Sequence, residues 1–193
     1  MKARLVIVGP PGAGKGTQAT TIAQAMGIPE ISTGAIFRAN IAGGTELGKR
    51  AQGYIDGGNL VPDEVTDAMV RARLGEPDAA AGFLLDGYPR NAHQVEELDR
   101  ILADLGTQLD AVIELVIPDD AIVGRLLHRA EVEGRADDTE PVIRHRIEVY
   151  HQQTQPVVSA YERRGIVLAI DGVGTIPEVH DRIVAALSAR LSA

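Results

Sequence analysis

The sequence predicts an α/β protein built on a doubly wound, five-stranded parallel sheet. Five short apolar runs lie along its 193 residues, and none shows the strict alternation of a half-exposed strand. Segments with helical periodicity separate these runs, and a glycine-rich loop directly follows the first of them. Strands that alternate with helices form parallel sheets covered on both faces, and ligands bind at the carboxyl ends of such strands.

The strands and helices follow from the apolar patterns in order. Strands are expected at residues 4–8, 28–32, 82–86, 111–117 and 166–171, and the second of these patterns is the weakest. Helices are expected at residues 17–26, 94–105, 118–130, 141–164 and 176–191. Gly27 and Gly106 follow two of the helices and Pro118 opens another, which is the usual asymmetry of helix ends. Pro156 is expected to interrupt the longest helix.

Two stretches do not fit the simple alternation. Residues 32–75 contain no strand pattern and predict three short helices, which are separated at Gly43-Gly44, at Gly57-Gly58 and at Pro62. Residues 130–139 form a polar segment between two predicted helices. Segments inserted beside the ligand edge of a sheet commonly close over substrates, so both are candidate covering elements of a single domain over residues 1–193.

Composition excludes several functional classes. The chain has no cysteine, which rules out disulfides and thiolate zinc sites. A net charge of −8 argues against a general nucleic-acid-binding protein. The start, Met1-Lys2-Ala3-Arg4, does not resemble a signal peptide, and no apolar run approaches membrane length. We therefore expect a soluble, cytoplasmic protein without nucleic-acid or membrane partners.

The glycine-rich loop predicts a phosphate-binding site. Residues 9–17 read Gly-Pro-Pro-Gly-Ala-Gly-Lys-Gly-Thr and follow the pattern GxxxxGK[ST] through Gly9, Gly14 and Lys15. Glycines allow the backbone to turn tightly and point N–H groups at phosphate oxygens, and the helix that follows adds its positive end. Gly16 stands where the pattern has a hydroxyl residue, so Thr17, phosphates and water would share a magnesium ion. The alternative is a chance turn, which the preceding strand and the Lys-Gly-Thr ending disfavour.

Asp86 ends a predicted strand, on the same sheet edge as the loop. A carboxylate there can hold a magnesium-bound water, although an ordinary turn or capping aspartate would look similar. The residues that follow, Gly87-Tyr88-Pro89-Arg90, favour the functional interpretation because they bring an arginine to the same edge.

Further arginines suggest an anionic ligand. Ser32-Thr33-Gly34 followed by Arg38 predicts a helix start whose arginine could grip a monophosphate together with Arg90, although a plain N-cap and a solvated arginine are the alternative.

Arginines and acids are balanced between residues 125 and 146, which is also compatible with a salt-bridged solvent face. Arg144 fits that interpretation, with Glu148 four residues later. Arg146 instead lies on the inward stripe of its helix, where a charge needs an anionic partner. Arg125 and Arg129 share one helix face and can reach the same anion.

These motifs together, with Asn59-Leu60-Val61-Pro62, Gln94 and Arg135-Ala136-Asp137-Asp138, resemble the adenylate kinase family over nearly the whole chain. The resemblance implies a P-loop NTPase core, a helical AMP-binding insertion at residues 32–61 and a short lid at residues 128–138. Many bacterial members carry a longer lid with four zinc-binding cysteines, which this chain lacks. Ala130-Glu131-Val132-Glu133 is a small insertion even relative to short-lid members.

The resemblance also implies site residues. ATP would contact Gly12, Ala13, Gly14, Lys15, Gly16, Thr17, Arg129 and Gly174. AMP would contact Thr33, Arg38, Asn59, Leu60, Val61, Gly87, Tyr88, Pro89, Arg90, Gln94, Arg135 and Arg146, with Gln94 at the adenine edge. The catalytic set would be Lys15, Asp86, Arg90, Arg125, Arg129, Arg135 and Arg146. Mg²⁺ would be held by Asp86 through water and by Thr17, without zinc.

The expected activity is reversible phosphoryl transfer from Mg·ATP to AMP, giving two ADP, by a monomer. A UMP or CMP kinase is the nearest alternative, since a base pocket also depends on backbone and shape. A P-loop nucleotide switch is an alternative of another class, but it would leave Arg38, Arg90 and Arg146 without a role.

Overall fold

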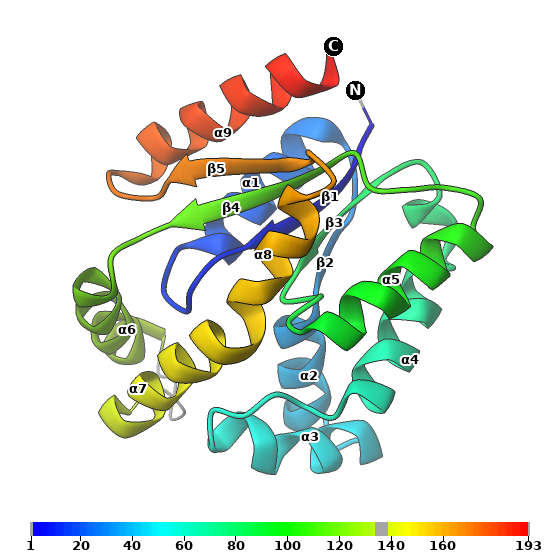
Figure 1. Ribbon diagram of the computed structural model, residues 1–193. Coiled ribbons are helices and arrows are strands. Elements are labelled where there is room, and N and C mark those ends of the chain that lie inside the picture. The colour runs from blue at the N-terminus through cyan, green and yellow to red at the C-terminus, as the bar shows by residue number, and fades with distance from the viewer. Residues whose placement is uncertain (1, 134–138, 193) are drawn as a thin grey trace.

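The computed structural model describes residues 2–133 and 139–192, and the side chains of residues 2–128 and 139–192. A parallel sheet runs through its centre with helices on both faces (Figure 1). The strands are β1 (Arg4–Val8), β2 (Glu30–Ser32), β3 (Phe83–Asp86), β4 (Ala111–Val116) and β5 (Val167–Asp171). Their order in the sheet is β2-β3-β1-β4-β5. The predicted fold class is confirmed, and each predicted strand forms with small shifts at its ends.

The position of β1 determines where the site lies. This strand pairs with β3 on one side and with β4 on the other, so the loop after Val8 leaves the middle of the sheet. The register places Ile7 of β1 opposite Asp86 of β3. The glycine-rich loop and Asp86 therefore emerge from adjacent strands at one edge, where the direction of chain winding reverses.

Helices cover the two faces of the sheet and bury two apolar clusters. On one face α1 (Lys15–Met26) and α9 (Ile176–Leu191) pack on the sheet through Ile22 and Ile183. On the other face α5 (Ala92–Asp104) and α8 (Gln155–Glu162) pack on it through Leu98 and Val157. The strands read as continuous apolar runs because both of their faces are covered.

The three helices predicted between residues 32 and 75 lie beside the sheet. They are α2 (Thr33–Ala42), α3 (Glu46–Asp56) and α4 (Asp63–Leu74), followed by the 3₁₀ turn η1 (Pro77–Ala79). Helix α4 also packs Val70 and Leu74 into the cluster under α5 and α8. Phe37, Ala51 and Val61 form a small core of their own. Helices α2 and α3 cross at Gly48, where a Cβ atom would overlap the backbone of Asn40. The glycine thus permits close packing of the two helices.

Two helix boundaries differ from the prediction. Helix α6 (Asp119–Glu133) continues past Ala130 into the segment predicted as a loop, because alanine and glutamate favour helix. The long helix is interrupted before Pro156, by a π-helical segment η2 (Tyr150–Thr154) that joins α7 (Glu140–Val149) to α8. Single π-helical turns occur frequently at functional sites.

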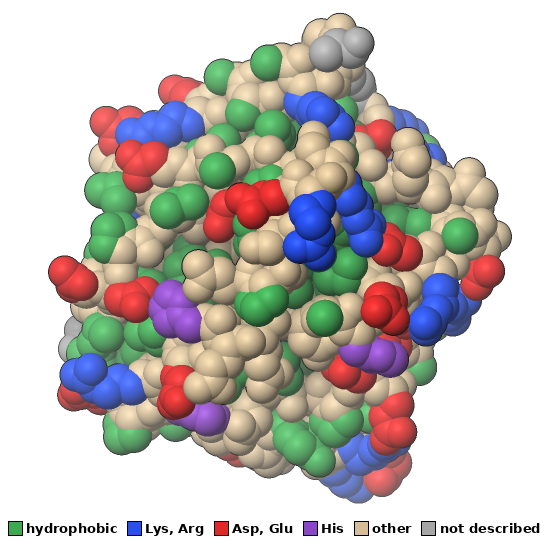
Figure 2. All heavy atoms as spheres, in the orientation of Figure 1, with side chains coloured by type: hydrophobic (Ala, Val, Ile, Leu, Met, Phe, Trp, Pro, Cys, Tyr) green, Lys and Arg blue, Asp and Glu red, His purple; other side chains and the backbone are tan. Residues whose placement is uncertain are grey.

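Surface charges are mixed, and Figure 2 shows acidic and basic side chains interspersed over the visible face. Arg144 pairs with Glu140 at 2.7 Å, one turn before it rather than with Glu148. Among residues 2–133 and 139–192, no helix combines the length and apolar character needed to span a membrane.

Candidate functional site

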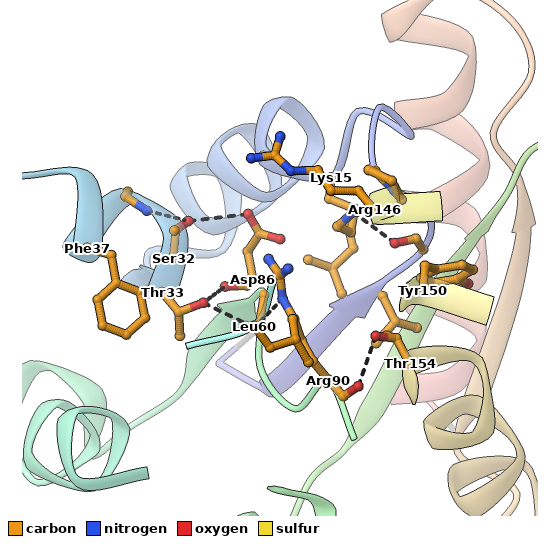
Figure 3. A pocket seen from close by; sticks show the side chains of 18 of the residues that line it. Lys15, Ser32, Thr33, Phe37, Leu60, Asp86, Arg90, Arg146, Tyr150 and Thr154 are labelled. Carbon is orange, nitrogen blue, oxygen red and sulfur yellow. Dashed lines mark hydrogen bonds between the residues drawn. The ribbon is translucent and has the colours of Figure 1, made fainter. Parts of the chain in front are cut away.

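A cleft of about 580 Å³ opens at the carboxyl ends of β1 and β3. Its walls come from the glycine-rich loop, the start of α2, the loop after β3, the end of α3 and the α7–η2 junction. Figure 3 shows Lys15, Asp86, Arg90 and Arg146 around the same space. The predicted site residues that line the cleft are Gly12, Gly14, Lys15, Gly16, Thr17, Thr33, Arg38, Asn59, Leu60, Val61, Asp86, Gly87, Pro89, Arg90, Gln94, Arg125 and Arg146.

The glycine-rich loop has the shape of a phosphate cradle. Gly12 and Gly14 adopt φ angles of 77° and 85°, which favour glycine. Gly14 caps the N-terminus of α1, so the positive end of that helix faces the cleft. The Nζ atom of Lys15 donates to the carbonyl oxygens of Gly9 and Pro10, both at 2.8 Å. These bonds hold the ammonium group beside the loop.

Asp86 lies opposite Gly16 of the glycine-rich loop, and glycine has no side chain to stand between them. A Cβ atom at Gly16 would lie 3.8 Å from Asp86 Oδ2, so the two segments approach closely without touching. The same Oδ2 atom accepts a bond from the hydroxyl of Ser32 at 3.4 Å. The exposed Thr17 lines the same part of the cleft. Hard oxygen ligands with space for water suit a hydrated Mg²⁺ ion.

Three hydrogen bonds to other residues of the protein hold Arg90 in place. Its backbone N–H donates to Gln94 Oε1 at 2.7 Å, and its carbonyl accepts from the hydroxyl of Thr154 at 2.8 Å. Its Nε atom donates to the carbonyl of Gly87 at 2.9 Å. The terminal nitrogens of the guanidinium are directed into the cleft (Figure 3). Such a group is pre-organised to grip an anion through paired hydrogen bonds.

Burial lowers the pKa of Arg90, and the nearby Arg146 adds to this effect, while Asp86 opposes it. An arginine nevertheless remains protonated at neutral pH. Two partly buried cations so close together create a strong local preference for an anion such as a phosphate.

The remaining predicted arginines occupy different walls. Arg146 lies at the end of α7 and donates to the carbonyl of Ile55, at 3.3 Å. Arg38 is exposed on α2, with its guanidinium over Gly34. Arg125 lies on α6 and approaches the carbonyl of Gly172 at 3.5 Å. The cleft thus has arginines on the side of the insertion and on the side of β5.

Thr33 and Gln94 are buried and bonded within the protein. Thr33 Oγ1 donates to the carbonyl of Gly87 at 3.0 Å, which ties the start of α2 to the loop after β3. Gln94 uses its side-chain nitrogen to donate to Asp63 Oδ1 at 2.7 Å. The Gln94 side chain, which is expected to contact adenine, therefore already has two protein partners, Arg90 and Asp63.

Several predicted residues lie elsewhere. Ala13 is buried in the apolar cluster beneath the loop. The Tyr88 side chain points into the opposite cluster, where its hydroxyl donates to Asp67 at 2.7 Å, and the Tyr88–Pro89 peptide is cis. Gly174 lies in the loop after β5, beyond the lining of the cleft. The Arg129 side chain and the whole of Arg135 lie outside the described residues.

The sequence alone did not single out Thr154, which lines the cleft, or Asp63, which bonds the cleft residue Gln94. Thr154 lies at the end of η2, and the wider π turn places its hydroxyl toward Arg90. Asp63 begins α4 and looks like an ordinary first-turn acid. Neither role has a local sequence signal, although Pro156 did indicate an irregular helix nearby.

The pKa values of two side chains outside the cleft, Glu114 and His151, are raised. Burial raises the pKa of Glu114 on β4, and Glu162 adds to that shift. Hydrogen bonds to Gln155 and to Asp119 raise the pKa of His151, and the His151–Asp119 contact is 2.9 Å.

Comparisons with known proteins identify the family. A family model described as "Adenylate kinase" matches residues 7–166. An adenylate kinase of Thermobifida fusca (strain YX) is 59% identical over 187 residues, which cover 97% of this chain and 99% of that protein. An adenylate kinase of Kocuria rhizophila is 61% identical over 184 residues, which cover 95% of this chain and 98% of that protein. The resemblance inferred from the motifs is confirmed, and the chain belongs to the adenylate kinase family.

Proposed function

We propose that this protein catalyses the reversible reaction ATP + AMP = 2 ADP, with the two nucleotides at opposite ends of one cleft. Adenylate kinases carry out this reaction, and the chain belongs to their family. The observation that carries the residue-level proposal is the position of the arginines. Arg90 and Arg146 face the glycine-rich loop across the cleft, so a second phosphate group would lie opposite the first.

The donor site would be the glycine-rich loop. Its N–H groups and Lys15 would bind the phosphates of ATP, while Arg125 and the segment around Gly174 would lie beside its base. Lys15 would exchange its bonds to Gly9 and Pro10 for bonds to phosphate oxygens, which costs little because an anionic acceptor replaces a neutral carbonyl acceptor for the ammonium group.

The acceptor site would lie between α2, α3 and the loop after β3. Arg38, Arg90 and Arg146 would bind the phosphate of AMP, and Gln94 would meet its adenine. Phosphoryl transfer requires little covalent work from the protein, so positioning and charge neutralisation would provide most of the rate enhancement. No general base is required, because the AMP phosphate is already ionised.

Magnesium would lie between Asp86 and Thr17, which both line the cleft. Asp86 would hold it through water, and the absent side chain of Gly16 leaves room for those waters. The ion would neutralise charge on the transferred phosphoryl group when bound. In the described part of the chain, no cluster of three acidic, His or Cys side chains could chelate a metal directly. Phosphates and water would therefore supply most of its ligands.

Closure of the cleft would exclude water as a competing acceptor. Residues 32–61 would form the AMP-binding insertion and residues 128–138 a short lid. The insertion already contacts α7, since His145 Nε2 lies 2.8 Å from Asn59 Oδ1 and Arg146 reaches Ile55. We further propose that the protein acts as a monomer in the cytoplasm.

The test is to incubate the protein with Mg·ATP and each of AMP, CMP, UMP, GMP or water, and to follow ADP. Strong dependence on AMP is expected. A preference for CMP or UMP would assign the protein to the neighbouring kinases, and turnover with water alone would refute the kinase proposal.

The arginines proposed to bind the AMP phosphate, which we call the acceptor clamp, have a test of their own. Arg90→Ala removes the bonds that its terminal nitrogens would make to the phosphate, and charge-assisted bonds contribute about 1.5–3 kcal/mol. Since about 1.4 kcal/mol corresponds to a factor of ten, we expect kcat/KM for AMP to fall at least about tenfold. A smaller loss would show that Arg90 does not bind the acceptor phosphate.

A further inference from the structure

The side-chain amide of Gln94 has one orientation that satisfies its surroundings. Gln94 is buried, in the first turn of α5. Its Oε1 accepts from the backbone N–H of Arg90 at 2.7 Å, and its Nε2 donates to Asp63 Oδ1 at 2.7 Å. If the amide rotated by half a turn, Nε2 would face an N–H donor and Oε1 would face a carboxylate. Both contacts would then be repulsive.

Asp63 belongs to a different element, so the constraint comes from tertiary structure. It begins α4, and its Oδ1 atom accepts a second bond from Asn91 Nδ2 at 2.8 Å. Asn91 is itself fixed, because its Oδ1 caps α5 by accepting from the backbone N–H of Gln94 at 2.9 Å. Asp63 thus receives two amide donors and can serve only as an acceptor.

The fixed amide keeps unused hydrogen-bonding capacity for a ligand. A Gln side chain has two N–H donors and an oxygen that can accept two bonds. The protein uses one donor and one acceptor position, which leaves one of each in a group that lines the cleft. The order in which the remaining donor and acceptor meet a base depends on the orientation of the amide.

We propose that Asp63 is a specificity-determining residue, which together with the backbone N–H of Arg90 fixes the Gln94 amide so that the acceptor site takes adenine and rejects a base with the opposite edge. This inference rests on the proposed function, in which the base of AMP meets Gln94. Adenine presents an acceptor at N1 and a donor at N6, whereas hypoxanthine presents a donor at N1 and an acceptor at O6. The fixed amide complements the first edge, and with the second edge donor faces donor and acceptor faces acceptor.

The sharpest probe is a pair of acceptors that differ only at that edge. AMP and inosine 5′-monophosphate (IMP) have the same ribose phosphate and nearly the same size. The quantity to measure is the ratio of kcat/KM for AMP to kcat/KM for IMP, at saturating Mg·ATP. Wild-type protein is compared with Asp63→Ala, which removes the acceptor of the Gln94 amide, and with Asp63→Asn, which retains an oxygen at that place.

We expect Asp63→Ala to lower the AMP/IMP ratio several-fold, within the factor of about ten that one correctly placed pair of base contacts provides, because the Arg90 N–H still favours the original orientation. Asp63→Asn should keep most of the ratio. Asp67→Ala is the matched control. It removes a carboxylate one turn later on α4, which bonds Tyr88 and approaches His93 at 3.2 Å but has no bond to Gln94. Its ratio should equal that of the wild type even if its melting temperature falls.

The outcomes separate the inference from the function on which it rests. No AMP-dependent ADP from the wild-type protein would refute both. Normal AMP turnover with an unchanged ratio in Asp63→Ala, or an equal fall in Asp67→Ala, would refute the inference alone. Equal use of AMP and IMP by the wild type would do the same. If Asp63→Ala does not melt cooperatively, Asp63→Ser is judged by the same ratio, since its hydroxyl can either donate or accept.

Discussion

The hydroxyl of Thr154 gives the most specific test of how the acceptor clamp is supported. Thr154→Val keeps the shape of the side chain and removes its bond to the carbonyl of Arg90. That bond is 2.8 Å long and Thr154 is 8% exposed, so water replaces it poorly. The substitution thus releases one of the three anchors of the Arg90 backbone and side chain.

The size of the effect follows from the loss of one buried partner. A carbonyl left without its hydrogen bond costs about 1–3 kcal/mol, which would lower the melting temperature by about 2–4 °C per kcal/mol in a protein of this size. Arg90 would also lose part of its pre-organisation. If about 1 kcal/mol of the cost appears in the complex with the acceptor, kcat/KM for AMP falls about fivefold.

The assay measures kcat and KM separately for each nucleotide, with a thermal melt of each variant. We expect KM for AMP to rise while KM for ATP stays constant, because the Thr154 hydroxyl supports Arg90, which belongs to the proposed acceptor site. Thr154→Ser keeps the hydroxyl and is the control, and it should restore most of the AMP kinetics.

Two results would refute this reasoning. If Thr154→Val lowers the melting temperature but leaves AMP kinetics intact, the bond is only structural. If Thr154→Ser, which keeps the hydroxyl, is as impaired as Thr154→Val, the hydroxyl bond to Arg90 does not account for the effect.

Three further predictions concern stability and the insertion. Burial raises the pKa of Glu114, so its protonated form favours the fold and the stability it contributes is lost as pH rises above its ordinary value of 4.5. Glu114→Gln should therefore raise the melting temperature at pH 7, and equal gains at pH 4 and pH 7 would contradict this. The pKa of His151 is also raised, but histidine is charged when protonated. Its bond with Asp119 therefore stabilises the fold below about pH 6.5, and that stabilisation is lost as pH rises through the raised pKa. Asp119→Asn should lower the melting temperature more at pH 5.5 than at pH 8.5, and the loss of stability should be under about 1 kcal/mol because the pair is exposed. Gly48→Ala should separate α2 from α3, because its Cβ would overlap the Asn40 backbone, and calorimetry should show weaker AMP binding with ATP binding retained.

Much of the fold was predictable because its signals are local. The five strands are short apolar runs, and glycines or prolines mark most helix ends. The boundaries that differed are those where local signals compete. Ala130 and its neighbours extend α6 because their helix propensity outweighs their polarity, and η2 begins at Tyr150, six residues before Pro156.

The site was predictable where its functional residues belong to short contiguous motifs. The loop before Lys15, the acid Asp86 and the arginine Arg90 each follow a strand, and parallel strands bring such ends to one edge. Their roles toward ATP, AMP and magnesium remain proposals.

The sequence by itself therefore determined the fold class, the family and part of the set of residues that meet at the cleft. Tertiary structure decided how those residues are held. Thr154 reaches Arg90 across 64 positions of the chain, and Asp63 reaches Gln94 across 31. A hydrogen bond depends on ångström-scale placement of two groups, and residues far apart in sequence acquire that placement only when helices from separate segments pack together.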